Sequence, residues 1–363
     1  MGANCRSVTN ERMRLMESKK LNICIIGLGN AGTEFCKMLI NKNEEIRKSI
    51  GYDIKITAIA ARSKGSLLDI KGIDLEKALK EVEKRGRFSE ENISLSDLET
   101  IELIRASKAD VLIELSTLSI EDGEPAISHI ETAFENNMHV ITANKGPIAW
   151  AFKRLNEIAK NKKLLFLYET TVMDGTPIFN LVKYTLPGCK VKAFKGILNS
   201  TTNFILEEME KGKSYEAAIK EAQRRGFAEA DPSLDVEGWD AAAKTAAIAN
   251  VLMDGDLTPM NIKRQGVSHI TAKDIEAAKM EDKKIKLFCE AYIEEGKVVG
   301  RVKPTVISNK DIFSNVDATS SILCITTDLM GEICIVEKDP EIEQTAYGIY
   351  SDLLTLIKEM ENL

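Results

Sequence analysis

The sequence has few of the residues that build metal centres, and those few are far apart. Only three histidines occur in 363 residues, and none of the seven cysteines forms a Cys-x-x-Cys pair. A zinc site needs clustered cysteine and histidine ligands, so this spacing argues against zinc. The odd number and the scatter of the cysteines predict reduced thiols, as in a cytoplasmic protein. The histidines are His129, His139 and His269.

Long apolar runs and an excess of basic charge are also lacking. No run approaches the ~18 residues that a membrane-spanning helix needs, and residues 1–20 have no apolar signal-peptide core. The net charge is −7, whereas a nucleic-acid-binding protein usually carries a basic surface. We therefore expect a cytoplasmic protein that binds neither membranes nor nucleic acid, in which residues 1–20 form a flexible extension.

Apolar runs alternate with helical periodicity in the first part of the chain. Short β-branched runs predict strands at 21–29, 55–61, 109–115 and 138–144, and helical spacing is found at 31–41, 74–85, 97–107 and 124–136. This alternation predicts an α/β fold with a doubly wound parallel sheet. We assign a Rossmann dinucleotide-binding domain to 21–146, together with the amphipathic last helix in 343–363.

The pattern changes after Lys145. Helices are predicted near 147–161, 201–211, 214–225 and 238–253, and strands at 164–169, 190–197, 297–307, 320–327 and 332–337. We interpret 147–342 as a second, α+β domain for catalysis and dimerisation. Because the chain ends at Leu363, we expect no appended regulatory domain.

A glycine-rich segment follows the first predicted strand. The sequence Gly-Leu-Gly-Asn-Ala-Gly at 27–32 precedes a helix, which is the context that a G-x-G-x-x-G motif requires. Its glycines permit a tight turn, a close backbone approach to a pyrophosphate and close helix–strand packing, and the helix N-terminus offers N–H groups to the phosphates. A plain glycine turn is the alternative. The expected dinucleotide contacts are Gly27, Gly29, Asn30, Ala31 and Gly32.

The end of the second strand indicates which dinucleotide is bound. An NAD enzyme usually has an acidic residue there, whereas this chain has Arg62 and Lys64. Both cations can meet a 2′-phosphate, which favours NADP over NAD; alternatively, both are solvated loop residues. Four more residues at the ends of the third and fourth strands are expected at the cofactor: Ser116, Thr142, Asn144 and Lys145.

Two polar segments are candidates for the substrate site. Residues 196–203 (GILNSTTN) lie between a strand and a helix, where Thr201 or Ser200 either caps the helix or binds a polar small molecule. Residues 227–244 carry five carboxylates ahead of an Ala-rich helix. There Asp240 and Lys244 are four residues apart and share a helix face. A charged pair in such apolar surroundings is costly unless function retains it.

Three blocks, TANK, GILNSTTN and AEADPSLDVEGWDAAAK, resemble homoserine dehydrogenase in that order, over about Leu21 to Ile275. The resemblance implies reversible oxidation of L-homoserine to L-aspartate 4-semialdehyde with NAD(P), in threonine and methionine biosynthesis, by a homodimer. It implies that Lys244 is the acid/base lysine, and that Lys145 serves the nicotinamide and substrate region. We expect burial beside a second lysine to lower the pKa of Lys244 toward working pH.

The resemblance assigns further roles. Glu229 and Asp240 hold the substrate's amino group and hydroxyl end, and Asp235 orients the lysine region. Gly175 and Thr201 are also expected at the substrate. A sodium ion is implied at the stretch that matches the family's metal site, through a glutamate and nearby main-chain carbonyls. The residues of that stretch are Glu169, Val172, Asp174 and Thr176.

Three departures from the family pattern leave other functions open. Asp174 stands where the family usually has Gly or Ala, and Ser200 stands where Gly is common. Residues 336–344 contain no glycine, although the family has a glycine-rich segment there. One alternative is a paralogous NAD(P)-dependent dehydrogenase of another amino or hydroxy acid. The other is a cofactor-binding protein without turnover, which an intact Lys244, Glu229 and Asp240 argue against.

Overall fold

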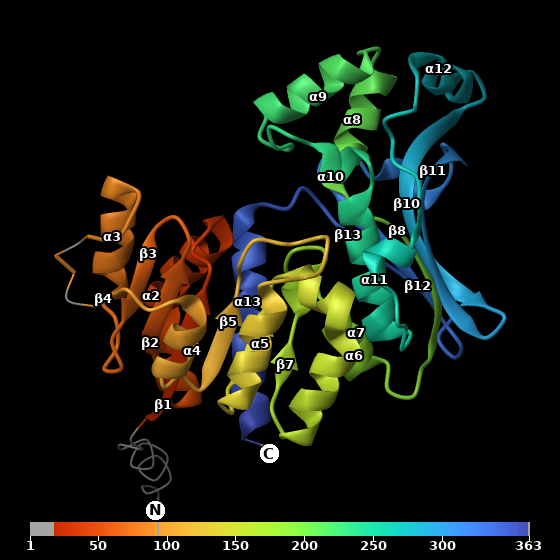
Figure 1. The fold of residues 1–363 in the computed structure, drawn as a ribbon. Coiled ribbons are helices and arrows are strands. Elements are labelled where there is room, and N and C mark those ends of the chain that lie inside the picture. The colour runs from red at the N-terminus through yellow and green to blue at the C-terminus, as the bar shows by residue number, and fades with distance from the viewer. Residues whose placement is uncertain (1–17, 90, 93, 362–363) are drawn as a thin grey trace, which may run out of the picture.

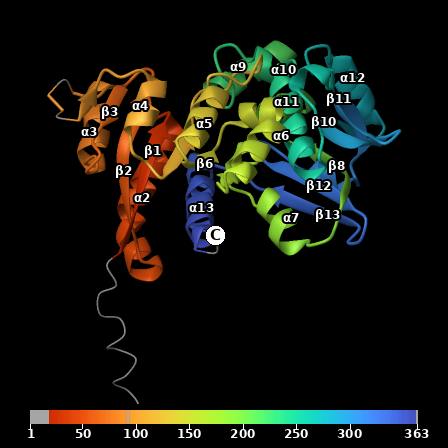
Figure 2. The same ribbon diagram turned by 60° about the horizontal axis from the view of Figure 1, so that its bottom comes forward.

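The computed structural model of the chain describes residues 18–89, 91–92 and 94–361. Most of the expected N-terminal extension therefore lies outside the described residues. Two β-sheets, of seven and six strands, form the framework. Figures 1 and 2 show the sheets in different parts of the molecule, with helices between them.

The first sheet is parallel at its centre, as the alternation of strands and helices predicts. Its strand order is β4-β3-β2-β1-β5-β6-β7, and β1 pairs in parallel with both β2 and β5. Two short antiparallel strands, β3 and β4, extend one edge and have no counterpart in the sequence prediction. On the other edge β7 extends the sheet beyond residue 146. The strands are β1 (Lys19–Ile26), β2 (Tyr52–Ala61), β3 (Gly65–Leu68), β4 (Leu95–Ser96), β5 (Val111–Glu114), β6 (His139–Thr142) and β7 (Phe166–Leu167).

Helices cover both faces of this sheet because β1 is apolar on both sides. Cys24 and Ile26 belong to one buried core, and Ile23 and Ile25 belong to a second core on the opposite face. Successive side chains of a strand point to opposite faces, so the continuous apolar run of β1 requires cover on each. The helices of this part are α2 (Asn30–Ile50), α3 (Leu75–Arg85), α4 (Thr100–Ala106), α5 (Ala126–Glu135) and α6 (Lys145–Asn161).

The second sheet is mainly antiparallel, with the order β13-β12-β8-β10-β11-β9. Its longest hairpin joins β10 to β11, and the sequence analysis did not single out β10, whose first residues are rich in lysine. The strands are β8 (Val191–Ile197), β9 (Lys263–Arg264), β10 (Lys283–Glu294), β11 (Lys297–Ser308), β12 (Ser321–Thr327) and β13 (Glu332–Glu337). The helices are α7 (Phe179–Thr185), α8 (Ser200–Glu210), α9 (Tyr215–Arg224), α10 (Ser233–Val236), α11 (Trp239–Leu252) and α12 (Ala272–Met280), with short 3₁₀ turns η1 (Glu169–Thr171), η2 (Pro259–Asn261) and η3 (Ile312–Asn315).

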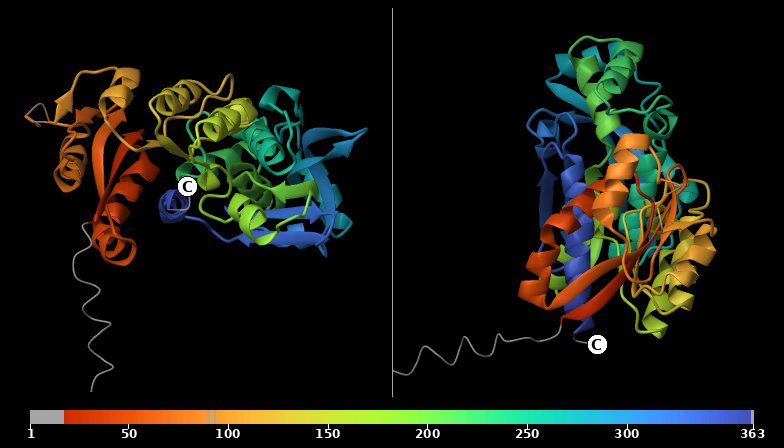
Figure 3. Two further views of the ribbon diagram at one scale, coloured as in Figure 1. Left: turned by 90° about the horizontal axis from the view of Figure 1, so that it is seen from below. Right: turned by 90° about the vertical axis from the view of Figure 1, so that its left-hand side faces the viewer.

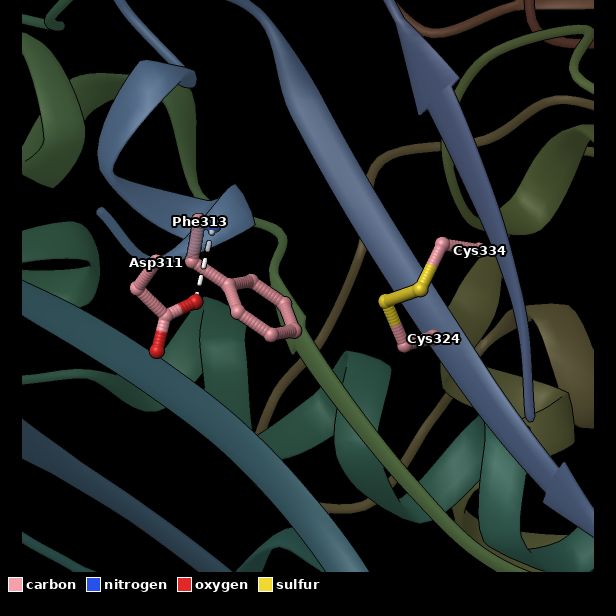
Figure 4. Close-up of a disulfide and its surroundings, with 4 residues drawn as sticks. All are labelled: Asp311, Phe313, Cys324 and Cys334. Carbon is pink, nitrogen blue, oxygen red and sulfur yellow. Dashed lines mark hydrogen bonds between the residues drawn. A yellow bond between two sulfur atoms is a disulfide. The ribbon is translucent and has the colours of Figure 1, made fainter.

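The expectation that all cysteines are reduced thiols is wrong for one pair. Cys324 and Cys334 form a disulfide between β12 and β13 (Figure 4). The two residues are direct partners in the antiparallel register, so the hairpin brings together cysteines that the sequence shows only as scattered. Glu332 lies close to both sulfur atoms, but the disulfide leaves no thiolate there to bind a metal.

The last helix, α13 (Ile342–Met360), lies in the middle of the molecule (Figure 3). Its buried side chains Ile349 and Leu353 share a core with Phe35 of α2. At Gly348 the helix lies so close to η1 that a Cβ on this residue would be 1.7 Å from Thr170 Oγ1. No helix within the described ranges is both long and apolar enough to cross a membrane.

We predict that Gly348→Ala lowers the free energy of unfolding by about 1–3 kcal/mol, the usual cost of overpacking a filled interior. Urea unfolding monitored by circular dichroism measures the change. Tyr347→Ala is the control, since the neighbouring Tyr347 is 53% exposed and such surface changes stay within about 0.5 kcal/mol. Equal stabilities of the two variants would contradict this close contact.

Candidate active site

The glycine loop between β1 and α2 is shaped to receive an anion. Gly27 has a φ of 99°, and a Cβ there would lie 2.2 Å from the Leu115 carbonyl oxygen. A Cβ on Gly32 would lie 2.6 Å from the Gly27 oxygen, whereas one on Gly29 would meet nothing within 4 Å. Gly29 is also the N-cap of α2, and no side chain caps that helix. The loop therefore leaves open space before a helix N-terminus, which fits the pyrophosphate of a dinucleotide.

The two cations after β2 differ in their surroundings. Lys64 Nζ donates a hydrogen bond to the carbonyl oxygen of Leu28, which ties the end of β2 to the glycine loop. Arg62 is exposed at the same strand end. The structure thus gives Lys64 a partner in the protein and leaves the Arg62 side chain accessible to a ligand.

The residues at the ends of β5 and β6 are hydrogen-bonded to one another beside the glycine loop. Asn144 Nδ2 donates to the Ser116 carbonyl oxygen at 3.1 Å, and Asn144 Oδ1 accepts from Gly146 N at 2.9 Å as the cap of α6. Thr142 Oγ1 donates to the Glu114 carbonyl oxygen at 3.0 Å. The Ser116 hydroxyl is buried without a protein partner, so it is available to a bound ligand.

A carboxylate between two lysines forms the centre of the site. Lys145 begins α6 and Asp240 and Lys244 lie on α11, and these two helices pack against each other. Asp240 Oδ1 lies 3.1 Å from Lys145 Nζ, and its Oδ2 lies 3.1 Å from Lys244 Nζ. Lys244 Nζ also donates to the Leu198 carbonyl oxygen at 2.6 Å.

Asn199, which the sequence analysis did not select, completes this cluster. Its Nδ2 donates to Asp235 Oδ1 at 2.6 Å and to Asp240 Oδ2 at 2.9 Å. Its Oδ1 accepts from Thr202 N at 2.9 Å, so Asn199 caps α8 rather than Thr201 or Ser200. An asparagine directly before a helix was the available signal. We call Lys145, Asn199, Asp235, Asp240 and Lys244 the lysine–carboxylate cluster.

The expected lowering of the Lys244 pKa is wrong. Burial does lower this pKa, but the charges of Asp240, Asp174 and Asp235 outweigh burial and raise it. Burial raises the pKa of Asp240, yet Lys244 and Lys145 together hold it well below its usual range. Because Asp240 lies between the two lysines, its carboxylate offsets the repulsion between their ammonium groups.

Two other residues expected at the substrate lie at the start of α8 and on the segment that leads to α10. Thr201 Oγ1 donates to the Phe227 carbonyl oxygen at 2.7 Å, which fixes the start of the segment that leads to α10. Glu229 lies on that segment, and its side chain is exposed. Its carbonyl oxygen accepts from Gln223 Nε2 at 3.1 Å.

The carboxylate expected at the sodium ion serves as a helix cap. Glu169 accepts hydrogen bonds from the backbone N–H groups of Ile178, Phe179 and Asn180, the last at 2.7 Å, at the start of α7. Three of the roughly four acceptor positions of the carboxylate are thereby used, which leaves at most one for a cation. Val172, on the same stretch, is buried.

The rest of the stretch expected at the sodium ion, residues 174–176, contacts the C-terminal part of the chain. Asp174 has a φ of 47° and accepts from Thr345 Oγ1 at 2.7 Å. A Cβ on Gly175 would lie 2.3 Å from the Gln344 carbonyl oxygen. Thr176 Oγ1 donates to Glu337 Oε1 at 2.9 Å. Gly175 thus permits a close approach of the segment before α13, and Asp174 and Thr176 fasten it.

Glu337 is a further side chain that the sequence analysis missed, although it drew attention to 336–344 for its lack of glycine. It ends β13 and is 8% exposed. Burial and the charge of Asp174 raise its pKa to about 7, while Thr176 and Lys244 oppose the shift. Its place in the primary sequence gives no signal, because β13 reaches the site only through the fold.

A parallel sheet with a glycine loop at the carboxyl end of β1, and a partly buried lysine–carboxylate cluster at the same edge, together define a nicotinamide-dependent dehydrogenase. Two family models agree with this class: "Homoserine dehydrogenase, NAD binding domain" matches residues 27–169, and "Homoserine dehydrogenase" matches residues 177–354. The chain belongs to the homoserine dehydrogenase family, which makes it an oxidoreductase acting on a CH–OH group.

Named relatives support this membership. The chain is 37% identical to a homoserine dehydrogenase of Methanocaldococcus jannaschii over 92% of its own length and 98% of that protein. It is 30% identical to an NAD(+)-dependent homoserine dehydrogenase of Pseudomonas canavaninivorans, over 92% and 95% of the two chains. A putative homoserine dehydrogenase of Archaeoglobus fulgidus superposes with a TM-score of 0.82 at 33% identity, over 93% and 99%.

Proposed function

We propose that this protein catalyses the reversible oxidation of L-homoserine to L-aspartate 4-semialdehyde with NADP or NAD. The observation that carries the proposal is the placement of Asp240 between the ammonium groups of Lys145 and Lys244. The family membership supplies the substrate, and the cluster supplies the groups that move a proton.

Lys244 is the acid/base residue in this proposal. NADP or NAD, when bound, accepts the hydride that leaves the alcohol carbon, so the protein must remove the hydroxyl proton. Lys244 holds its proton in the free site because its pKa is raised. A substrate ammonium entering the site competes for the carboxylates and lowers the Lys244 pKa. A neutral Nζ then takes the hydroxyl proton, and in the reverse direction its ammonium returns a proton to the carbonyl oxygen.

The remaining members of the cluster hold this geometry. Asp240 fixes the position of Lys244 Nζ and balances the charge of Lys145. Asn199 donates to both Asp235 and Asp240, which orients the two carboxylates toward the lysines. Lys145, at the start of α6, polarises the oxygen of the reacting group.

NADP is the cofactor we favour between the two nicotinamide dinucleotides. Arg62 is exposed at the end of β2, where the ribose lies in folds of this type, and its guanidinium suits a 2′-phosphate. The Pseudomonas canavaninivorans relative is named as NAD(+)-dependent, so members of the family differ in this respect.

We further infer a cytoplasmic homodimer that serves threonine and methionine biosynthesis, as the family resemblance implies. Exposed apolar side chains on the β12–β13 hairpin support self-association: Leu329 is 74% exposed and Met330 62%. The strand β13 is an edge of the second sheet. Unpaired edges and exposed apolar side chains are features of protein–protein contacts.

We predict that Lys244→Ala lowers kcat at least ~100-fold, because it removes the proton-transfer group. Absorbance at 340 nm, with purified protein, L-homoserine and NADP or NAD at alkaline pH, measures this. Lys273→Ala is the control, since Lys273 is an exposed lysine of α12. Near-normal activity of Lys244→Ala would refute the role of Lys244. A wild-type protein that binds cofactor but shows no homoserine-dependent signal would favour a dehydrogenase of another amino or hydroxy acid.

We predict that Arg62→Ala raises the KM for NADP about tenfold, the loss expected for one charge-assisted hydrogen bond. The KM for NAD should change less than about twofold, because NAD has no 2′-phosphate. Initial rates with each dinucleotide at saturating L-homoserine give both constants. Lys71→Ala, which removes an exposed cation of the neighbouring loop, should alter neither. An equal rise of both constants would remove the reason to favour NADP.

A further inference from the structure

Glu337 is a buried carboxylate with one unused oxygen. Thr176 Oγ1 donates to its Oε1 at 2.9 Å, which fixes the orientation of the carboxylate. Its Oε2 is buried and has no hydrogen-bond partner in the protein. A buried carboxylate oxygen without a donor is costly, so a ligand that supplies the donor would offset the cost.

The hydrogen bond from Thr176 places Glu337 against the stretch that carries Asp174, and both Asp174 and Lys244 act on Glu337 electrostatically. Asp174 raises the pKa of Glu337 and also that of Lys244, and Lys244 in turn opposes the shift at Glu337. Lys244 is already committed to Asp240 and to the Leu198 carbonyl oxygen. Glu337 is therefore coupled electrostatically to Lys244, whose own hydrogen bonds go to other groups.

The charges of this region call for a cation. The cluster and its two neighbours contain four carboxyl groups and two lysine ammonium groups: Asp174, Asp235, Asp240 and Glu337 against Lys145 and Lys244. Buried charges need partners of opposite sign. Above pH 7, where Glu337 is ionised, a neutral amide or hydroxyl donor would satisfy Oε2 but leave the excess negative charge, whereas an ammonium group satisfies both.

We propose that Glu337 is a substrate-binding residue whose unpartnered Oε2 accepts a hydrogen bond from the ammonium group of the amino-acid substrate. This inference rests on the proposed function and adds a specificity determinant to it. The family resemblance gives this task to Glu229, but the Glu229 side chain is exposed on the segment between α9 and α10. Glu337, by contrast, is buried and is held by Thr176.

The test is Glu337→Gln, which keeps the shape of the side chain and removes its charge. We expect the KM for L-homoserine to rise at least about tenfold, the loss of one charge-assisted hydrogen bond, with kcat within about threefold. The inhibition constant of 4-hydroxybutanoate, which lacks the amino group, should change less than about twofold, and the dinucleotide KM should not change. Glu332→Gln is the matched control, because Glu332 is an exposed glutamate at the other end of β13.

Two results would overturn the inference while leaving the proposed function intact. One is an active Glu337→Gln enzyme whose KM for L-homoserine is unchanged, or whose binding of L-homoserine and 4-hydroxybutanoate weakens equally. The other is a rise in the dinucleotide KM instead, which would place Glu337 at the cofactor. A wild-type protein without homoserine-dependent activity would overturn the proposed function and the ammonium assignment together.

A second variant tests the inference in case Glu337→Gln does not fold. Thr176→Val removes the hydroxyl that fixes Oε1 and keeps the charge of Glu337. We expect a smaller rise in the KM for L-homoserine, again without an effect on the inhibition constant of 4-hydroxybutanoate. An unchanged KM in this variant would argue that the orientation of Glu337 has no role in binding.

Discussion

The bridge that Asp240 makes between Lys145 and Lys244 is the interaction on which the site depends. It joins the first residue of α6 to the first turns of α11 and so links the end of the parallel sheet to the second part of the molecule. Two partly buried ammonium groups side by side would repel each other, and one carboxylate oxygen toward each lysine offsets this repulsion. The arrangement keeps Lys244 charged until a substrate changes the balance of charges around it.

The C-terminal segment, which follows β13, contacts the loop that contains Asp174 and Thr176. After β13, the chain passes Thr176 and Asp174 and enters α13, which packs against α2 and η1. Gly175 and Gly348 allow this approach because neither has a side chain at the point of contact. The C-terminal helix thereby packs against α2, the helix that follows the glycine loop.

Much of this could be predicted from sequence because it depends on local patterns. The apolar run of β1, the glycines at 27–32 and the alternation of strands and helices predict the α/β fold, and the i, i+4 spacing places Asp240 beside Lys244. The disulfide, the cap at Asn199 and the position of Glu337 could not be predicted in this way. Each depends on pairing between strands or on contacts across the fold. The pKa of Lys244 was misjudged for the same reason, since two lysines were considered without the carboxylate between them.

The pH dependence of kcat/KM for L-homoserine in Asp240→Asn, compared with the wild type, tests the central claim most directly. Asp240 raises the pKa of Lys244, and oxidation needs the neutral amine. The wild-type rate should therefore rise with pH, and the limb of the profile should move to lower pH by about one unit or more when the charge of Asp240 is removed. A limb at the same pH in both proteins would show that Asp240 does not control the protonation of Lys244.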